Sequence, residues 1–115
     1  MIQVSNVHEN TWDWGKTVDV IAENGEGIVE MSFNNSNPGV CYLSNLSVVP
    51  SKRRQGIATV LLEFCIDYCA KKHIFRIDLD SVKENFVVNM YRKYGFCDIK
   101  ESDSMIQMYK LMNGV

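Results

Sequence analysis

The stretch that decides the fold runs from residue 43 to residue 58: Leu43-Ser44-Asn45-Leu46-Ser47-Val48-Val49-Pro50-Ser51-Lys52-Arg53-Arg54-Gln55-Gly56-Ile57-Ala58. Its first half predicts a buried strand that stops at Pro50, because proline has no amide hydrogen to continue a ladder. Its second half places a basic turn and Gly56 directly before an apolar-periodic segment that predicts a long helix.

A strand, a tight basic turn and a helix in this order predict an anion-binding site. The first backbone N–H groups of a helix have no partner within it, and the helix dipole adds roughly half a positive charge there. Gly56 lets the backbone approach a bulky anion, and the turn amides can form an anion-binding nest. Arg53 and Arg54 add side-chain charge that suits phosphate oxygens. The natural ligand of such a turn is a pyrophosphate.

Two motifs resemble those of the GNAT N-acetyltransferase superfamily. Arg53-x-x-Gly56-x-Ala58, after the strand that ends Leu46-Ser47-Val48-x-Pro50, is similar to the family's acyl-CoA-binding motif. Met90-Tyr91-Arg92-Lys93-Tyr94-Gly95-Phe96 is similar to the motif that closes its second helix. The resemblance covers about residues 17 to 112. It implies acetyl-CoA as the acyl donor, an amine of a small molecule or protein as the acceptor, and no metal.

Outward from this stretch, the pattern predicts a single α/β domain over residues 1–115. Strands are expected over residues 17–23, 28–33, 40–49, 74–79, 96–100 and 104–111, and helices over residues 57–72 and 84–93. Residues 1–16 give the weakest pattern, with only a possible short strand at Ile2-Gln3-Val4. The resemblance implies the three-layer acyl-CoA N-acyltransferase fold, with a central mixed and largely antiparallel sheet.

One departure from the family precedes these strands. Family members normally have two helices there, which form part of the wall of the acceptor site. In this chain only the residues from Val7 to Val18 are available for such helices. The acceptor side is therefore expected to be unusually open or completed by another subunit. Because Trp12 and Trp14 lie in this shortened segment, a homodimer is expected. The competing interpretation packs both tryptophans against their own sheet and leaves a monomer.

The resemblance also assigns roles to residues. Free amides of Leu46, Ser47 and Val48 would pair with the pantetheine arm, and one would polarise the thioester carbonyl. Tyr91 would contact the cofactor and protonate the leaving thiolate, since a phenol with a reference pKa of about 10 is a donor at neutral pH. The family often has an asparagine at the start of this helix, for which Asn85 is favoured over Glu84. The remaining cofactor-binding candidates are Arg53, Arg54, Gln55, Gly56, Ile57, Ala58 and Thr59.

The sequence does not single out a general base. The strand before the turn carries no carboxylate, so Ser44 or Tyr42 would order a water that relays the proton. Glu30, one strand away, is a carboxylate candidate, and a solvated charge on the strand face is the alternative. A catalytically degenerate domain that binds acyl-CoA as a sensor or structural ligand therefore competes with an enzyme. A third interpretation is an interaction module in which Arg53 and Arg54 form only a solvated turn.

Composition argues against other classes of function. The formal charge of −2 over 115 residues gives no electrostatic case for a nucleic-acid partner. No apolar run approaches the roughly 18 residues of a membrane span, and no signal-peptide pattern follows Met1, so a cytoplasmic protein is expected. The four cysteines form no C-x-x-C pair and are expected to be free, reduced and mostly buried: Cys41, Cys65, Cys69 and Cys97.

Overall fold

The computed structural model describes residues 4–53, 56–83 and 87–112. Within these ranges seven strands form one mixed sheet in the order β1-β2-β3-β4-β5-β7-β6. Neighbouring strands pair antiparallel except β4 and β5, which are parallel and are joined by the crossover helix α1. The strands are β1 (Val4–Trp12), β2 (Gly15–Ala22), β3 (Gly27–Asn34), β4 (Val40–Val48), β5 (Arg76–Val82), β6 (Cys97–Glu101) and β7 (Met105–Leu111), and the helices are α1 (Ile57–Lys71) and α2 (Val87–Lys93).

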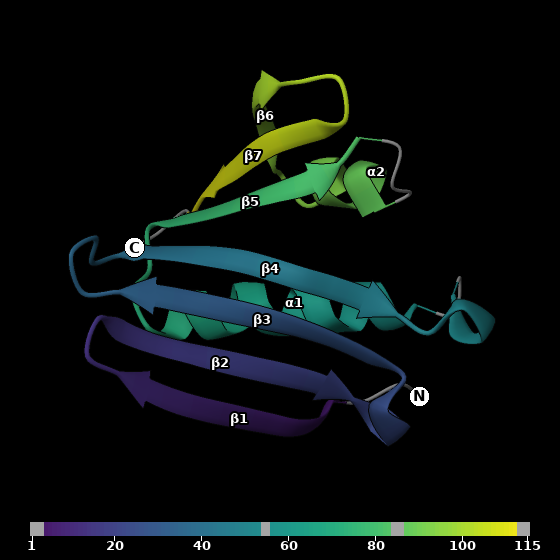
Figure 1. The fold of residues 1–115 in the computed structure, drawn as a ribbon, viewed down its shortest axis with the longest axis horizontal. Coiled ribbons are helices and arrows are strands. Elements are labelled where there is room, and N and C mark those ends of the chain that lie inside the picture. The colour runs from purple at the N-terminus through teal and green to yellow at the C-terminus, as the bar shows by residue number, and fades with distance from the viewer. Residues whose placement is uncertain (1–3, 54–55, 84–86, 113–115) are drawn as a thin grey trace.

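Both helices cover the same face of the sheet (Figure 1). The core lies between this face and the helices, because alternate strand residues such as Val20, Met31 and Ile77 are buried against the apolar stripe of α1. No helix in the described part of the chain covers the opposite face. None of the described helices is long and apolar enough to cross a membrane.

Strands β4 and β5 separate part of the way along their length. They pair from Val40 beside Arg76 to Leu43 beside Leu79, although each strand continues beyond the last pair. Two parallel strands that stop pairing leave backbone N–H and C=O groups without a ladder partner. The resemblance implied free amides in this part of β4, and the gap lies directly before the basic turn.

An extra residue in β4 marks the start of this gap. Ile28 pairs with Ser47 and Glu30 pairs with Ser44. Two residues therefore lie between these pairs on β4, whereas only one lies between them on β3. Asn45 has a φ of +57°, a left-handed conformation that a residue other than glycine adopts at some energetic cost. The bulge keeps the side chains on either side of it, Leu43 and Leu46, on the core side of β4.

Strand β1 corrects the interpretation of residues 1–16. Where the sequence indicates only a possible short strand that ends at Val4, the chain forms a nine-residue strand from Val4 onward, which pairs with β2 from Val4 beside Ala22 to Trp12 beside Gly15. Most of its side chains are exposed on both faces, so the sequence carries no apolar alternation to reveal it. Residues 1–3 lie outside the described residues.

The two tryptophans lie at the β1–β2 turn and are exposed. Trp12 and Trp14 are 50% and 44% accessible to solvent, so about half of each side-chain surface is left uncovered. The indole N–H of Trp12 donates to the Oγ1 of Thr17 at 3.2 Å. A homodimer through this region stays a prediction. Of the four cysteines, three are free and buried and Cys97 is free and exposed.

Candidate active site

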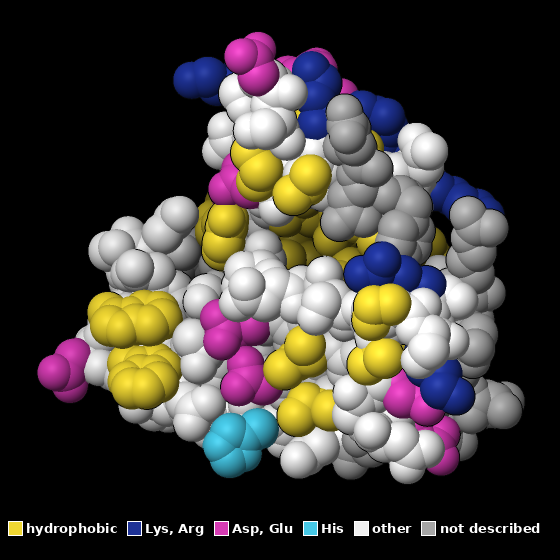
Figure 2. Space-filling model, turned by 45° about the vertical axis from the view of Figure 1, so that its right-hand side comes forward, with side chains coloured by type: hydrophobic (Ala, Val, Ile, Leu, Met, Phe, Trp, Pro, Cys, Tyr) yellow, Lys and Arg dark blue, Asp and Glu magenta, His cyan; other side chains and the backbone are white. Residues whose placement is uncertain are grey.

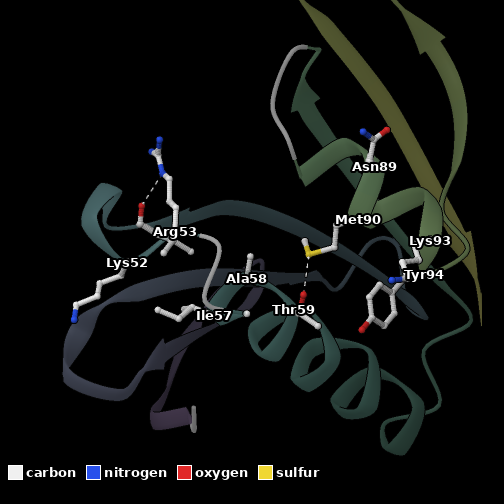
Figure 3. A pocket seen from close by; sticks show the side chains of 11 residues that line it. Lys52, Arg53, Ile57, Ala58, Thr59, Asn89, Met90, Lys93 and Tyr94 are labelled. Carbon is white, nitrogen blue, oxygen red and sulfur yellow. Dashed lines mark hydrogen bonds between the residues drawn. The ribbon is translucent and has the colours of Figure 1, made fainter. Parts of the chain in front are cut away.

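The first cavity of the candidate site lies where α1 begins, beside α2. It has a volume of about 380 Å³ and opens on one side of the basic turn (Figure 3). Its walls are Val48, Lys52, Arg53, Gly56, Ile57, Ala58, Thr59, Asn89, Met90, Lys93 and Tyr94. Three of these side chains are cationic and none is a carboxylate, so the cavity suits an anionic ligand.

The backbone at the entrance to α1 has the form that the sequence predicts for an anion turn. Gly56 is the N-cap of α1 and has a φ of +85°, in the left-handed region that favours glycine. The first helical residues, Ile57, Ala58 and Thr59, follow it on the cavity wall, where the N–H groups of the first turn have no helical partner. Gly56 and the N-terminal turn of α1 therefore both line the cavity with backbone groups.

Side chains hold this turn in place. The Arg53 Nε donates to the Val48 carbonyl oxygen at 3.3 Å, which joins the turn to the end of β4. Lys52 forms an ion pair with Glu26 at 3.6 Å. The Thr59 hydroxyl donates to the sulfur of Met90 at 3.5 Å, which links α1 to α2 across the cavity (Figure 3). Arg54, Gln55 and Asn85, all predicted to bind the cofactor, lie outside the described residues.

The second cavity is the gap between β4 and β5. It has a volume of about 160 Å³, and its walls are Leu43, Ser44, Asn45, Leu46, Asp80, Ser81, Val82, Tyr91 and Met105. Met90 lines the first cavity and Tyr91 the second, so α2 adjoins both. Ser44, Leu46 and Tyr91 were predicted site residues, and the fold brings them together here. Ser47, on the same strand, is exposed but lines neither cavity.

Tyr91 is buried, with 5% of its surface exposed. Burial raises the pKa of its hydroxyl to about 12, and the neighbouring Cys65 adds a smaller effect. The hydroxyl is therefore protonated at neutral pH and can only donate a proton. Its ring packs against Phe96 with the centroids 5.6 Å apart, which fixes the side chain independently of the hydroxyl.

Asp80 supplies a carboxylate at the same cavity, and the sequence interpretation missed it. The Tyr42 hydroxyl donates to the Asp80 Oδ2 at 2.8 Å, and burial together with this carboxylate raises the pKa of Tyr42 to about 12. The predicted strand ended at Leu79, whereas β5 continues to Val82. The alternation of Asp78 and Asp80 was the available signal, because two strand residues that are two apart share a face.

Glu30 lies beside this region on β3. Ser44 Oγ donates to Glu30 Oε1 at 3.4 Å, and the two residues are register partners. Burial of the Glu30 carboxyl, followed by the adjacent carboxyl of Asp19, raises its pKa. Glu30 is therefore half-buried and hydrogen-bonded, in contrast to a freely solvated charge.

Several further cavity residues carried no sequence signal of their own. The sequence gives Tyr94 no role beyond its place in the second motif, but it lines the first cavity while its hydroxyl donates to Glu63 at 2.9 Å. Asn89 and Lys93 lie on α2 and line the same cavity (Figure 3). Residues that could hold a metal ion do not gather in groups of three in the described ranges.

Comparison with known proteins places this geometry in a family. Residues 6–96 match the sequence profile described as "Acetyltransferase (GNAT) family". No curated protein matches the chain at a significant level.

Solved structures share the fold at low sequence identity. The PaiA N-acetyltransferase of Thermoplasma acidophilum, crystallised with coenzyme A, is 23% identical, with a TM-score of 0.68 over 83% of this chain and 59% of its own. The ribosomal-protein-S18-alanine N-acetyltransferase of Escherichia coli is 16% identical, with a TM-score of 0.74 over 100% of this chain and 95% of its own. Ard1 of Thermoplasma volcanium is 17% identical, with a TM-score of 0.71 over 82% of this chain and 70% of its own. The chain thus spans less than two thirds of the first of these proteins. The likeness confirms the predicted α/β fold around a mixed sheet.

Proposed function

Because the chain belongs to the GNAT acetyltransferase family, we propose that it is an N-acetyltransferase that moves the acetyl group of acetyl-CoA to an amine. The observation that carries this proposal is the gap between β4 and β5, where Asp80 and Tyr91 line one cavity. A group that can accept a proton and a group that can donate one therefore flank the place where an acyl group would lie.

The first cavity would hold the pyrophosphate and the adjoining part of the cofactor. Its anion-binding features are the left-handed Gly56, the free N–H groups of the first turn of α1 and the side chains of Arg53 and Lys93. A family neighbour was crystallised with coenzyme A, which supports a CoA ester as the ligand class. Acetyl-CoA is a substrate in this scheme and donates its acyl group.

The second cavity would hold the thioester. Backbone groups of β4 beyond Leu43 lack ladder partners on β5, so they are available to bind the pantetheine arm and the thioester carbonyl. An N–H group aimed at that oxygen stabilises the negative charge that develops when the amine attacks. Leu46 and Val48, both predicted to contact the cofactor, belong to this strand.

Two side chains, Asp80 and Tyr91, would transfer the protons that the reaction requires. The acceptor amine forms a C–N bond to the acyl carbon while Asp80 takes the proton from its nitrogen. The C–S bond then breaks, and Tyr91 gives its proton to the departing thiolate. Asp80 afterwards releases its proton to water and Tyr91 regains one from water, which restores both side chains for the next turnover. Ser44 stays in the scheme as a hydrogen-bonding residue on the wall of the cavity.

The test is a turnover assay with purified chain, acetyl-CoA and a panel of primary amines. We expect amine-dependent release of free thiol, with a matching acetylated amine detected by mass spectrometry. Acetyl-CoA should also raise the melting temperature, because a ligand that binds only the folded state stabilises it. A rise in melting temperature without thiol release from any amine would favour the acyl-CoA sensor instead. No shift at millimolar acetyl-CoA would reject both functions.

A further inference from the structure

Two carboxylates lie on the uncovered face of β5, and their partners differ. Asp78 and Asp80 alternate with buried residues of this strand, so they share a face. The guanidinium of Arg76 donates to Asp78 and lies over the ring of Tyr109, 4.9 Å from the ring centroid. Asp78 is therefore neutralised by a cation that is itself held in place. Asp80 is exposed and forms no ion pair with any residue that the structure describes.

Tyr42 is the partner of Asp80. Its hydroxyl donates to the Oδ2 of Asp80 at 2.8 Å. Gln107 lies opposite Asp80 on β7, and within the described ranges neither it nor any other side chain adds a second hydrogen bond to this carboxylate. Figure 2 shows acidic side chains that reach the surface among apolar ones. An exposed carboxylate rotates freely unless a partner holds it, so the bond from Tyr42 fixes the direction in which the Oδ1 of Asp80 points.

The bond lies where β4 and β5 begin to separate. Tyr42 is level with Asp78 in the parallel ladder, and the pairing ends one residue later with Leu43 beside Leu79. The Tyr42 hydroxyl nevertheless reaches Asp80, two residues further along β5 than its register partner. It therefore holds a residue of the second cavity from a position at the edge of the gap, and Tyr42 itself lines neither cavity.

The Tyr42 hydroxyl is a donor at neutral pH. Burial, followed by the hydrogen bond to the Asp80 carboxylate, raises the pKa of Tyr42 to about 12. The phenol thus keeps its proton while the carboxylate accepts the bond. Hydrogen bonds from a neutral donor to a charged acceptor are stronger than those between neutral groups, so this one is able to orient an exposed side chain.

We propose that Tyr42 is a positioning residue for acetyl transfer, because its hydroxyl orients the Asp80 carboxylate so that the free oxygen meets the proton of the acceptor amine. The proposal rests on the acetyltransferase function above and adds a residue that acts through the base. A general base works only within hydrogen-bond reach of the proton that it takes, so a rotated carboxylate is slower although its charge is unchanged. Tyr42 neither gives nor takes a proton in this scheme.

A bond that only fastened β4 to β5 would have a different effect. Its loss would widen the gap and weaken the binding of acetyl-CoA. Loss of positioning instead slows the chemical step and leaves the affinity for acetyl-CoA unchanged, because the residues that line the two cavities stay in place. The affinity and the rate of the chemical step therefore distinguish the two roles.

The experiment is a double-mutant cycle of Tyr42→Phe and Asp80→Asn, measured by single-turnover mixing with acetyl-CoA and the most active amine of the panel. Tyr42→Phe should lower the rate about tenfold, the effect of losing a hydrogen bond to a charged group, with an unchanged Kd for acetyl-CoA. Asp80→Asn should lower the rate roughly a hundredfold. In the Asp80→Asn background, Tyr42→Phe should cause no further loss, since it acts only through Asp80.

Tyr109→Phe is the matched control. It removes a hydroxyl from the same face of the sheet, and Tyr109 does not bond to Asp80, so the rate should stay at the native value. Tyr42 is 41% exposed and phenylalanine keeps its ring, so Tyr42→Phe is expected to fold, which circular dichroism establishes.

The outcomes separate this role from the proposed function. A native rate in Tyr42→Phe, a loss that persists in the Asp80→Asn background, or a weakened affinity for acetyl-CoA in place of a slower step would overturn the positioning role and leave the acetyltransferase function standing. A native rate in Asp80→Asn would remove the base and the role of Tyr42 together. If the native chain releases no thiol with any amine, the acetyltransferase function and the role of Tyr42 are both rejected.

Discussion

Gly56→Val is expected to weaken the binding of acetyl-CoA by roughly tenfold to a hundredfold. A β-branched residue in the left-handed conformation of Gly56 costs about 1–3 kcal/mol. The valine side chain would also stand where the pyrophosphate approaches the backbone. Isothermal titration of acetyl-CoA into the variant measures the effect, with circular dichroism to establish that it is folded.

Two companion variants separate strain from obstruction. Gly25 also has a positive φ, of +70°, and a Cβ there meets no atom within 4 Å. Gly25→Val thus introduces similar backbone strain outside the cavity, and it should bind acetyl-CoA normally. Gly56→Asn tolerates the left-handed conformation but still adds a side chain, so it should retain part of the defect. Normal acetyl-CoA binding by Gly56→Val would mean that the pyrophosphate site lies elsewhere.

Tyr91→Phe is expected to lower the rate of acetyl transfer by roughly a hundredfold, which is the usual contribution of a general acid. The phenylalanine keeps the ring contact with Phe96, so the fold and the affinity for acetyl-CoA should change little. Single-turnover mixing of enzyme, acetyl-CoA and amine measures the chemical step directly. The loss should be in this step and not in the binding of either substrate.

Tyr68→Phe is the matched control for that loss. Its hydroxyl donates to Glu9 on the helix-covered side of the sheet, and Tyr68 lines neither cavity. Removing it should leave the rate of acetyl transfer unchanged. If Tyr91→Phe and Tyr68→Phe have the same single-turnover rate as the native chain, Tyr91 is not the general acid.

The sequence predicted the order of strand, turn and helix around Gly56, and the helix α1 itself, well because both depend on local chemistry. Pro50 stops β4 and Gly56 takes the left-handed conformation, and neither outcome needs a distant partner. The apolar stripe of α1 likewise follows from residues three and four apart. Residues with a strong local preference were therefore placed correctly.

The proposed acid–base pair of Asp80 and Tyr91 could not be predicted in the same way, because it depends on register between distant strands. Tyr42 and Asp80 are 38 positions apart in the chain. They come into contact only because β4 and β5 pair in parallel. The hydrogen bond from Ser44 to Glu30 depends in the same way on the antiparallel register of β3 and β4. Strand β1 was missed for a related reason, since an exposed edge strand has no buried face to impose alternation.

The central claim is that acetyl-CoA binds across both cavities, with its acyl group in the gap between β4 and β5. A crystal structure of the chain with acetyl-CoA tests it most directly. We expect the pyrophosphate against the N–H groups that follow Gly56, and the thioester beside β4 within reach of the Tyr91 hydroxyl. A structure in which acetyl-CoA is bound away from these two cavities, or in which saturating acetyl-CoA leaves both empty, would contradict the account.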